Sequence, residues 1–305
     1  MIWQKTIARP LTVTGIGLHS GRPVSMSIHS ASANQGLKFI RTDLPDRPQV
    51  RAHFSRVVDT NRATTLAEGQ ATLSTVEHLL AAFYGLGIDN AVIEVDGPEV
   101  PIMDGSAKPF VDLLLQADST SLPWPRTYLV VNKTIEVSNG DGWMRVVPGQ
   151  PRIMYAINFP HPLIRRQRYS VPLDSDHFRR EIAPARTFGF LKEVQFLQSQ
   201  GLARGGSLEN ALVLDDADVL NPGGLRFPEE FVRHKILDAL GDLALLGLPI
   251  LGRVEVSRGS HDLHQQFIKQ LINQEKAWRL WVPPLHNRTL RRTSQPAPLW
   301  QGVPA

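Results

Sequence analysis

The segment from Phe227 to Gly247 constrains the fold and the chemistry of this chain more than any other. Pro228, the two glutamates that follow it and the closing Gly247 are residue types that begin and end a helix. At about 100° per residue, its apolar residues fall on one face. They are Val232, Ile236, Ala239, Leu240, Leu243 and Leu246. The pattern predicts an amphipathic helix packed on a core.

A second face of this helix carries His234, Asp238 and Asp242 at successive turns, with Lys235 at its margin. An imidazole and a carboxylate one turn apart can bind the same metal ion. A solvated helix face is the alternative, and for so short a pattern it is the more common one. Both aspartates, however, lie in the later half of the helix, where the helix dipole disfavours carboxylates and Asp is a poor helix former. Their placement indicates a role beyond solubility.

Composition narrows the functional classes. The chain has 305 residues, of which 42% are hydrophobic and 20% are charged, so it is globular and long enough for two domains. A formal charge of +4 allows an anionic small substrate or a membrane surface, and it does not require nucleic acid. The chain has no cysteine, which excludes disulfides, cysteine zinc sites and thiol catalysis. The N-terminus lacks the apolar region of a signal peptide, and no apolar run is long enough to span a bilayer, so we expect a cytoplasmic protein.

The first half of the chain begins with strands and turns over residues 2–58. The spacing of Gly15, Gly17 and Gly21 misses the dinucleotide fingerprint by one residue, which argues against a nucleotide cofactor. A helix is predicted over 74–85, where Ser74 and Glu77 have the spacing of a capping box. The capping box explains Glu77 as a purely structural residue, but it gives no role to the next residue, His78. A strand over 90–95 and a helix over 106–116 follow.

The second half begins after residues 119–126, whose Pro and Ser content is typical of a domain boundary. Strands are predicted over 128–133, 135–137, 143–147, 153–159, 211–215 and 252–256, and a short helix around 194–198 ends at Gly201. Arg165–Arg168 is a basic cluster of the kind usually found in an exposed loop. From about residue 285 the composition predicts a poorly ordered tail.

The two halves repeat one pattern, in which strands are followed by a helix with a histidine, a glycine stop and a short Val-rich strand. A duplication would place the two helices face to face, with His78 near His234. His78, His234 and Asp238 would leave one tetrahedral position of a metal for water, as in catalytic zinc sites. Glu77 could then act as the base on that water.

His261 is free for acid chemistry, with Asp242 available to hold its ring or raise its pKa. His264 is a rival ligand, for which a surface position is the preferred interpretation.

Five motifs together resemble one family closely. They are Ser-Thr-Val-Glu-His-Leu at 74–79, Pro-Ile-Met-Asp-Gly-Ser-Ala at 101–107, Ala-Arg-Thr-Phe-Gly-Phe at 185–190, Leu-Arg-Phe-x-x-Glu-Phe-Val-Arg-His-Lys-x-Leu-Asp at 225–238 and Gly-Ser-His-x-Leu at 259–263. In order and spacing, they resemble UDP-3-O-acyl-N-acetylglucosamine deacetylase, the zinc amidase of the committed step of lipid A synthesis. The resemblance runs from about Ile2 to Leu271.

The resemblance implies an α+β fold of two similar domains, each a β-sheet packed with helices as a two-layer sandwich, with the active site between them. The expected domains are 1–122 and 126–284, the second with an acyl-passage insert over about 188–206, and 285–305 is the expected tail. The metal ligands become His78, His234 and Asp238, which hold one catalytic ion. Zn²⁺ is expected, and Fe²⁺ is possible with this ligand set.

The same resemblance assigns the other roles. Glu77 becomes the general base and His261 the general acid, with Asp242 as its partner. Thr187 matches the threonine that stabilises the oxyanion, and Lys235 matches a substrate-contacting lysine. The further substrate positions are Phe159 near the uridine site, Phe188 at the insert, and Val194, Leu197, Ala203 and Ser207 along the acyl passage.

Three residues depart from the family pattern. Asn158 replaces a common Asp, Arg204 stands where an apolar residue is common, and Ser260 separates the glycine from His261. None of the three belongs to the metal set.

The implied reaction is metal-dependent hydrolysis of the N-acetyl amide of UDP-3-O-acyl-N-acetylglucosamine, which releases acetate. The expected partner is this acylated UDP-amino-sugar, with no nucleic acid, at most peripheral membrane contact, and a monomeric state. A non-catalytic relative that binds a nucleotide sugar is the alternative, but every catalytic residue type is present. A metalloprotease is disfavoured because the chain lacks His-Glu-x-x-His.

Overall fold

The computed structural model describes residues 2–284 of the chain. Its two largest sheets each have five strands in equivalent order. The first has the order β2 (Leu11–Ile16), β3 (Pro23–Ser30), β9 (Ala91–Val95), β4 (Leu37–Arg41), β5 (Gln49–Arg51). The second has the order β12 (Ile135–Asn139), β13 (Gly142–Val147), β19 (Arg253–Ser257), β14 (Arg152–Phe159), β15 (Arg165–Pro172). In each sheet only one pair is parallel, β4 with β9 and β14 with β19.

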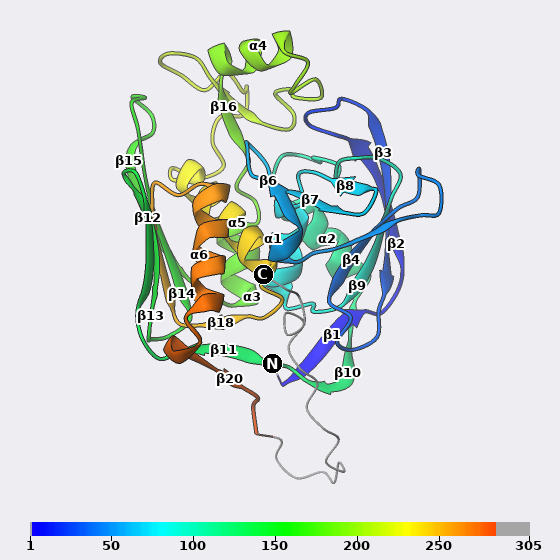
Figure 1. Ribbon diagram of the computed structural model, residues 1–305. Helices are drawn as coiled ribbons and strands as arrows, with labels where there is room; N and C mark the ends of the chain where they lie inside the picture. Colours follow the sequence, from blue (N-terminus) through cyan, green and yellow to red (C-terminus); the bar gives the residue numbers. More distant parts are fainter. Residues whose placement is uncertain (1, 285–305) are drawn as a thin grey trace.

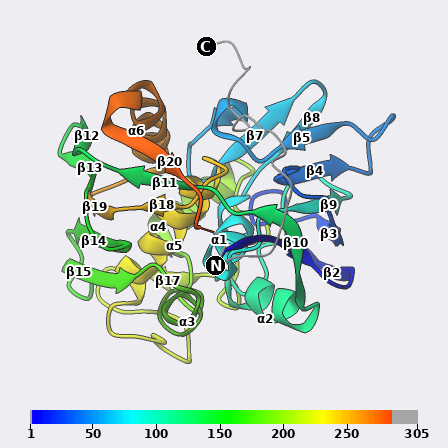
Figure 2. The ribbon, with the colours of Figure 1, turned by 90° about the horizontal axis from the view of Figure 1, so that it is seen from below.

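The helices repeat in the same way. In the first unit β9 lies in the chain between α1 (Glu77–Leu86) and α2 (Lys108–Gln116), and in the second β19 lies between α5 (Glu230–Ala244) and α6 (His261–Asn273). Figures 1 and 2 show the two sheets on opposite outer sides of the molecule, with these helices between them. The predicted α+β fold is confirmed, and the two units follow the same order of strands and helices.

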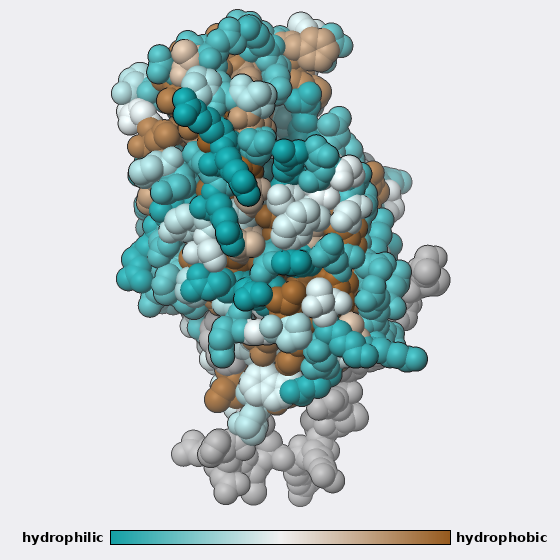
Figure 3. All heavy atoms as spheres, turned by 90° about the vertical axis from the view of Figure 1, so that its left-hand side faces the viewer, coloured by the Kyte–Doolittle hydropathy of each residue, from teal (hydrophilic) through white to brown (hydrophobic). Residues whose placement is uncertain are grey.

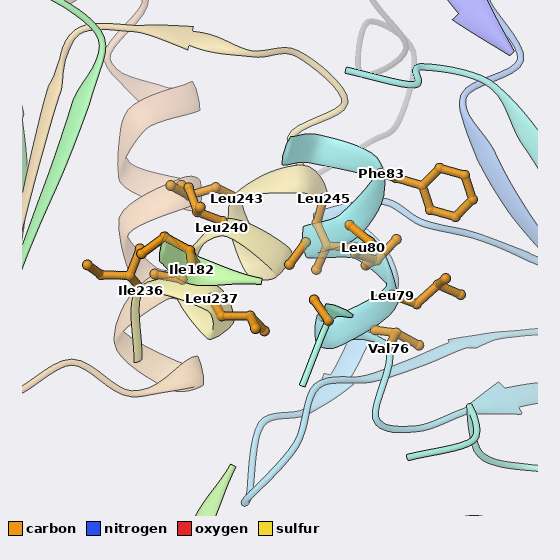
Figure 4. Close-up of a cluster of buried hydrophobic side chains, with 14 of the residues drawn as sticks. Val76, Leu79, Leu80, Phe83, Ile182, Ile236, Leu237, Leu240, Leu243 and Leu245 are labelled. Atoms are coloured by element: carbon orange, nitrogen blue, oxygen red, sulfur yellow. The ribbon is translucent and has the colours of Figure 1, made fainter. Parts of the chain in front are cut away.

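The core lies on the inner faces of both sheets. Figure 4 shows Leu79 and Phe83 of α1 pointing away from α5, and Ile236 and Leu243 of α5 pointing away from α1. All four side chains are fully buried. Each helix therefore covers its own sheet, and burying one such side chain contributes about 1.5–3 kcal/mol.

The close approach of α1 and α5 depends on Gly241. A Cβ atom at this position would lie 2.0 Å from the carbonyl oxygen of Glu77. Because no real side chain tolerates that distance, only glycine lets the two helix backbones meet here. The crossing brings the first turn of α1 against the last turns of α5, next to the predicted ligand Asp238.

Smaller elements complete the structure. The three-stranded sheets are β6 (Val57–Asp59), β7 (Thr65–Glu68), β8 (Ala71–Leu73), and β18 (Ile250–Leu251), β11 (Tyr128–Val131), β20 (Trp278–Trp281). The short helical segments are η1 (Phe54–Arg56), α3 (Ser175–His177), η2 (Phe178–Ile182) and η3 (Glu275–Ala277). Between residues 188 and 214 lie β16 (Phe188–Phe190), α4 (Leu191–Ser199) and β17 (Leu212–Leu214), with α4 at the top of Figure 1. The helix predicted around 194–198 and the strand predicted over 211–215 are thus confirmed.

Two local predictions need correction or comment. Residues 119–126, predicted as a domain boundary, contain strand β10 (Ser119–Pro125), which pairs with β1 (Trp3–Ile7), and the boundary stays a prediction. The basic cluster Arg165–Arg168 is not a loop but the start of β15, an edge strand paired with β14. Charged side chains are common on edge strands, and the arginines of this cluster are exposed to solvent. Figure 3 shows the side of the molecule that carries β12–β15, where hydrophilic residues predominate.

Helix α6 was not predicted, although Ser260 gives it a standard start by accepting a hydrogen bond from the Leu263 N–H. The predicted tail over 285–305 lies outside the described residues. Among residues 2–284, no helix is long and apolar enough to cross a membrane.

Candidate metal centre and active site

Three buried side chains converge where α1 meets α5. Nε2 of His78 lies 3.6 Å from Oδ1 of Asp238, and Nε2 of His234 lies 3.2 Å from the same oxygen. A tetrahedral ion with metal–ligand distances of about 2.0–2.1 Å holds its donor atoms about 3.3–3.4 Å apart. The spacing therefore fits one tetrahedral divalent ion, and the two-nitrogen, one-oxygen donor set suits Zn²⁺ or Fe²⁺. Asp238 is only 4% exposed, so the solvated-face alternative is wrong.

The groups around these side chains fix their orientation. Nδ1 of His234 lies 3.0 Å from the carbonyl oxygen of Ala185, which accepts a hydrogen bond from Nδ1–H and so leaves the Nε2 lone pair for a metal. The ammonium of Lys235 lies 2.6 Å from Oδ2 of Asp238, the carboxylate oxygen that faces away from His234. Burial alone would raise the pKa of Asp238, but its interactions with His234, Lys235 and His78 hold it well below its usual range. Asp238 is thus an ionised carboxylate with one oxygen directed at the two imidazoles.

Glu77 lies beside this cluster, and the predicted capping box does not form. Helix α1 begins at Glu77 with Val76 as its N-cap and no side-chain capping bond, while the Ser74 hydroxyl accepts from Thr65. The Glu77 carboxylate instead accepts a hydrogen bond from the Thr64 N–H, at 3.1 Å. Burial raises its pKa, although His261 and His78 act in the opposite direction. The box fails because Ser74 lies too far before the helix to cap it.

His261 at the start of α6 faces the same cleft. Its Nδ1 donates to Oδ2 of Asp242 at 2.7 Å, and Asp242 is fully buried. Burial would lower the pKa of His261, but the charge and hydrogen bond of Asp242 raise it to about 9. At neutral pH His261 therefore carries a proton that it can donate.

His264 contradicts the preferred sequence interpretation, because it is not a surface residue. It is fully buried, and its Nδ1 lies 2.8 Å from Oδ2 of Asp242. Asp242, His261 and His264 could be taken for a second metal cluster. Their donor atoms are 2.7 and 2.8 Å apart, which is hydrogen-bond spacing and too short for two ligands of one tetrahedral ion.

One cleft of about 1110 Å³ collects most of the predicted site residues. Glu77, His78, Phe159, Thr187, Phe188, His234, Lys235, Asp238 and His261 all line it. The Phe159 and Phe188 rings meet edge to face with centroids 5.7 Å apart, and they form an apolar wall. Asp242 lies behind His261 rather than in the lining.

Thr187 is held by its backbone on both sides. Its N–H donates to the carbonyl oxygen of Gly105 at 2.8 Å, and its carbonyl oxygen accepts from the N–H of Leu212 at 2.7 Å. The neighbouring Arg186 forms a buried ion pair with Glu230 at the start of α5. These contacts fix the segment that also supplies Ala185 to His234.

The residues proposed for the acyl passage lie outside this lining. Leu197 and Ala203 are buried, Val194 is half-buried and Ser207 is exposed. The Arg204 side chain is exposed, while its backbone N–H donates to the carbonyl oxygen of His19. The insert therefore packs against the loop after β2 from the first unit.

Sequence reasoning missed His19 and Arg62, two further cleft residues. Burial lowers the pKa of His19, and the Glu99 carboxylate holds the N–H groups of His19 and Ser20. The glycine-rich bend over 15–21 was the available signal for this loop, because such bends carry functional groups close to a site.

Comparisons with known proteins point to one family. Residues 4–273 match the model of the family described as UDP-3-O-acyl N-acetylglycosamine deacetylase. The chain is 46% identical over 279 residues to the UDP-3-O-acyl-N-acetylglucosamine deacetylase of Syntrophus aciditrophicus (strain SB), with 91% of this chain and 89% of that protein covered. It is 45% identical over 281 residues to the protein so named from Geobacter sp. (strain M21), with 92% of each covered. For the one from Geotalea uraniireducens (strain Rf4), the identity is 43% over 291 residues and covers 95% of each.

Proposed function

The chain belongs to the family of UDP-3-O-acyl-N-acetylglucosamine deacetylases, and we propose that its reaction takes place at the centre formed by His78, His234 and Asp238. The protein is an amide hydrolase that deacetylates UDP-3-O-acyl-N-acetylglucosamine in lipid A biosynthesis. One observation carries the assignment of the site. Two imidazoles and a carboxylate at metal-ligand spacing share a cleft with a buried carboxylate, Glu77, and a protonated imidazole, His261.

We propose Zn²⁺ as the ion, one per chain, with Fe²⁺ as the alternative. Such an ion supplies Lewis acidity, which lowers the pKa of water and polarises the amide carbonyl. His78 and His234 would hold it through Nε2 and Asp238 through Oδ1, the atoms that converge. Lys235 keeps the second oxygen of Asp238 occupied, so that a single oxygen is directed at the ion.

Glu77 takes the proton of the attacking water. Its carboxylate has one hydrogen bond, from the Thr64 N–H, and its position in the cleft lining lets it face the reacting groups. A pKa raised by burial suits a base, because it strengthens the affinity for that proton. As the proton leaves, the water oxygen forms a bond to the acetyl carbon.

His261 donates its Nε2 proton to the amide nitrogen as the C–N bond breaks. Asp242 keeps the ring protonated on both nitrogens and fixes its orientation through Nδ1. The Thr187 hydroxyl lines the same cleft and can donate a hydrogen bond to the oxyanion that forms on the carbonyl oxygen. The products are acetate and the free amine of the sugar.

The cleft also offers surfaces that suit the apolar and the charged parts of the substrate. The edge-to-face pair of Phe159 and Phe188 offers an apolar surface, and Lys235 offers a positive charge beside the metal ligands. We propose that the acyl chain follows the insert over residues 188–206, past Val194, Leu197, Ala203 and Ser207. Burying each CH₂ there would contribute about 0.8 kcal/mol. We propose further that the enzyme acts as a cytoplasmic monomer with at most peripheral membrane contact.

The test is an assay of acetate release from UDP-3-O-acyl-N-acetylglucosamine by the purified protein, together with elemental analysis of its metal. We expect about one divalent ion per chain, loss of turnover on chelation and recovery when Zn²⁺ or Fe²⁺ is restored. Turnover that persists in metal-free protein would contradict the proposed centre. Substrate binding without acetate release would support the non-catalytic alternative instead.

A further inference from the structure

Two histidines of α6 share one carboxylate oxygen beneath the cleft. Nδ1 of His261 and Nδ1 of His264 lie 2.7 and 2.8 Å from Oδ2 of Asp242. The other oxygen, Oδ1, accepts a bond from the Thr64 hydroxyl at 2.5 Å. Asp242 and His264 are fully excluded from solvent, so these three donors replace the hydration of the carboxylate.

The shared oxygen fixes the protons of both rings. An ionised carboxylate only accepts hydrogen bonds, so each Nδ1 carries a hydrogen. The same carboxylate does not charge both rings equally. Burial lowers the pKa of His264, and its own bonds to Asp242 only partly offset this effect, whereas the pKa of His261 is raised to about 9. His261 is thus the charged member of the pair and His264 the neutral one.

The environment of His264 holds it in this state. Its Nε2 lies 3.4 Å from the hydroxyl of Tyr155 on β14, which can donate to it. A Cβ atom at Gly259 would lie 2.3 Å from that hydroxyl and 2.9 Å from the His264 Nε2. The floor of the cleft at residue 259 is therefore glycine because the Tyr155–His264 pair occupies the space below it.

We propose that His264 is a positioning residue for the deacetylation: as a neutral donor, it holds the Asp242 carboxylate in the orientation that directs His261 into the cleft. The inference rests on the proposed role of His261 as the general acid. His264 touches neither the cleft nor the predicted metal ligands in the described contacts. Its ring meets that of His261 edge to face, and its hydrogen bond toward the site is the one to Asp242.

The charge on Asp242 is divided between its donors. If the bond from His264 is removed, more of that negative charge is available to His261, and the pKa of His261 rises further. The other charged groups near the two rings are Glu77 of α1 and Lys235 and Asp238 of α5, and Tyr155 of β14 is also titratable. A substitution at residue 264 leaves all of them in place, so a change in the pKa of His261 reports on Asp242.

The experiment compares H264L and H264N in the metal-containing protein. Leucine keeps a similar volume without a donor, whereas asparagine retains a neutral N–H near the position of Nδ1. We expect kcat of H264L to fall about 10–100-fold, the range typical for outer partners of an active-site ligand, and H264N to recover most of that loss. We also expect the pKa of His261, measured by NMR and by the alkaline side of the kcat profile, to rise in H264L.

A matched control is H53L, which removes another buried histidine outside the cleft. It is expected to lower the melting temperature without moving the pKa of His261. A normal kcat and an unchanged pKa of His261 in H264L would overturn the proposal. A loss of kcat that H264N does not relieve would overturn the donor role. The NMR titration measures the effect of His264 on the pKa of His261 and needs no turnover. If an active H261A variant showed that His261 is not the general acid, the titration would still test whether His264 and His261 share Asp242.

Discussion

The imidazole rings of His78 and His234 meet edge to face, with their centroids 5.0 Å apart and their planes at 87°. They come from α1 and α5, the corresponding helices of the two repeated units. The first unit alone offers only His78, and the second offers His234 and Asp238. The centre forms only where the two units pack together, so its residues respond to changes in either helix.

Replacing His234 by Ala should abolish both metal binding and turnover. The substitution removes one of three converging donors and leaves two, which is too few for a stable site. Elemental analysis and acetate release measure the two effects. His29→Ala, on the partly exposed face of β3, is the control and should retain both properties. Full metal occupancy in His234→Ala would remove this residue from the ligand set.

Glu77→Gln should lower kcat by about 10²–10⁴, the usual contribution of a general base. The amide can still accept the Thr64 N–H, so the melting temperature and the metal content should stay close to those of the wild type. The measurement is kcat beside these two quantities. Near-normal turnover with a lowered melting temperature would leave Glu77 a structural role only.

The kcat profile should fall as the pH rises through about 9, because His261 then loses the proton that it donates. Asp242→Asn removes the charge that raises this pKa, so the decline should move down toward the ordinary histidine value of about 6.5. Rates at saturating substrate between pH 6 and pH 10 would show the shift. An alkaline decline at the same pH in both proteins is the result that counts against the His261–Asp242 assignment.

Thr187→Val should reduce kcat by about 10²–10³, which is the typical cost of removing one oxyanion donor. Valine matches the shape of threonine, and the backbone bonds to Gly105 and Leu212 do not involve the side chain. The Michaelis constant should therefore change little. An unchanged kcat would exclude Thr187 from stabilisation of the oxyanion.

Gly241→Ala should weaken the metal centre although residue 241 is no ligand. The new methyl group would lie 2.0 Å from the carbonyl oxygen of Glu77, so α1 and α5 must separate. Such overpacking costs about 1–3 kcal/mol of stability and moves His78 away from His234. Gly223→Ala is the matched control, because nothing lies within 4 Å of its added Cβ. Urea unfolding and metal affinity that equal those of the control would contradict this account.

Local sequence patterns predicted several elements of the structure correctly. The apolar period of 227–247 marked α5, and the repeated order of strands and helices indicated two similar units. These signals are local, because a helix or strand that covers a sheet must bury one face, and the sequence records that face directly. The predicted start of α1 was wrong because it used local spacing alone. Ser74 and Glu77 have the spacing of a capping box, but the surrounding structure begins the helix at Glu77 and turns its carboxylate into the cleft.

The sequence by itself determined the residue types of the site and the helices that carry them, because one helical turn places His234 beside Asp238 wherever the helix lies. The repeat predicted that His78 lies near His234, but only the tertiary structure decided how closely they approach, through the crossing at Gly241. It alone also decided that His264 is buried against Asp242 beneath the cleft. The physical reason is that these contacts join elements far apart in the chain. Their distances depend on how whole sheets and helices pack, which no local spacing encodes.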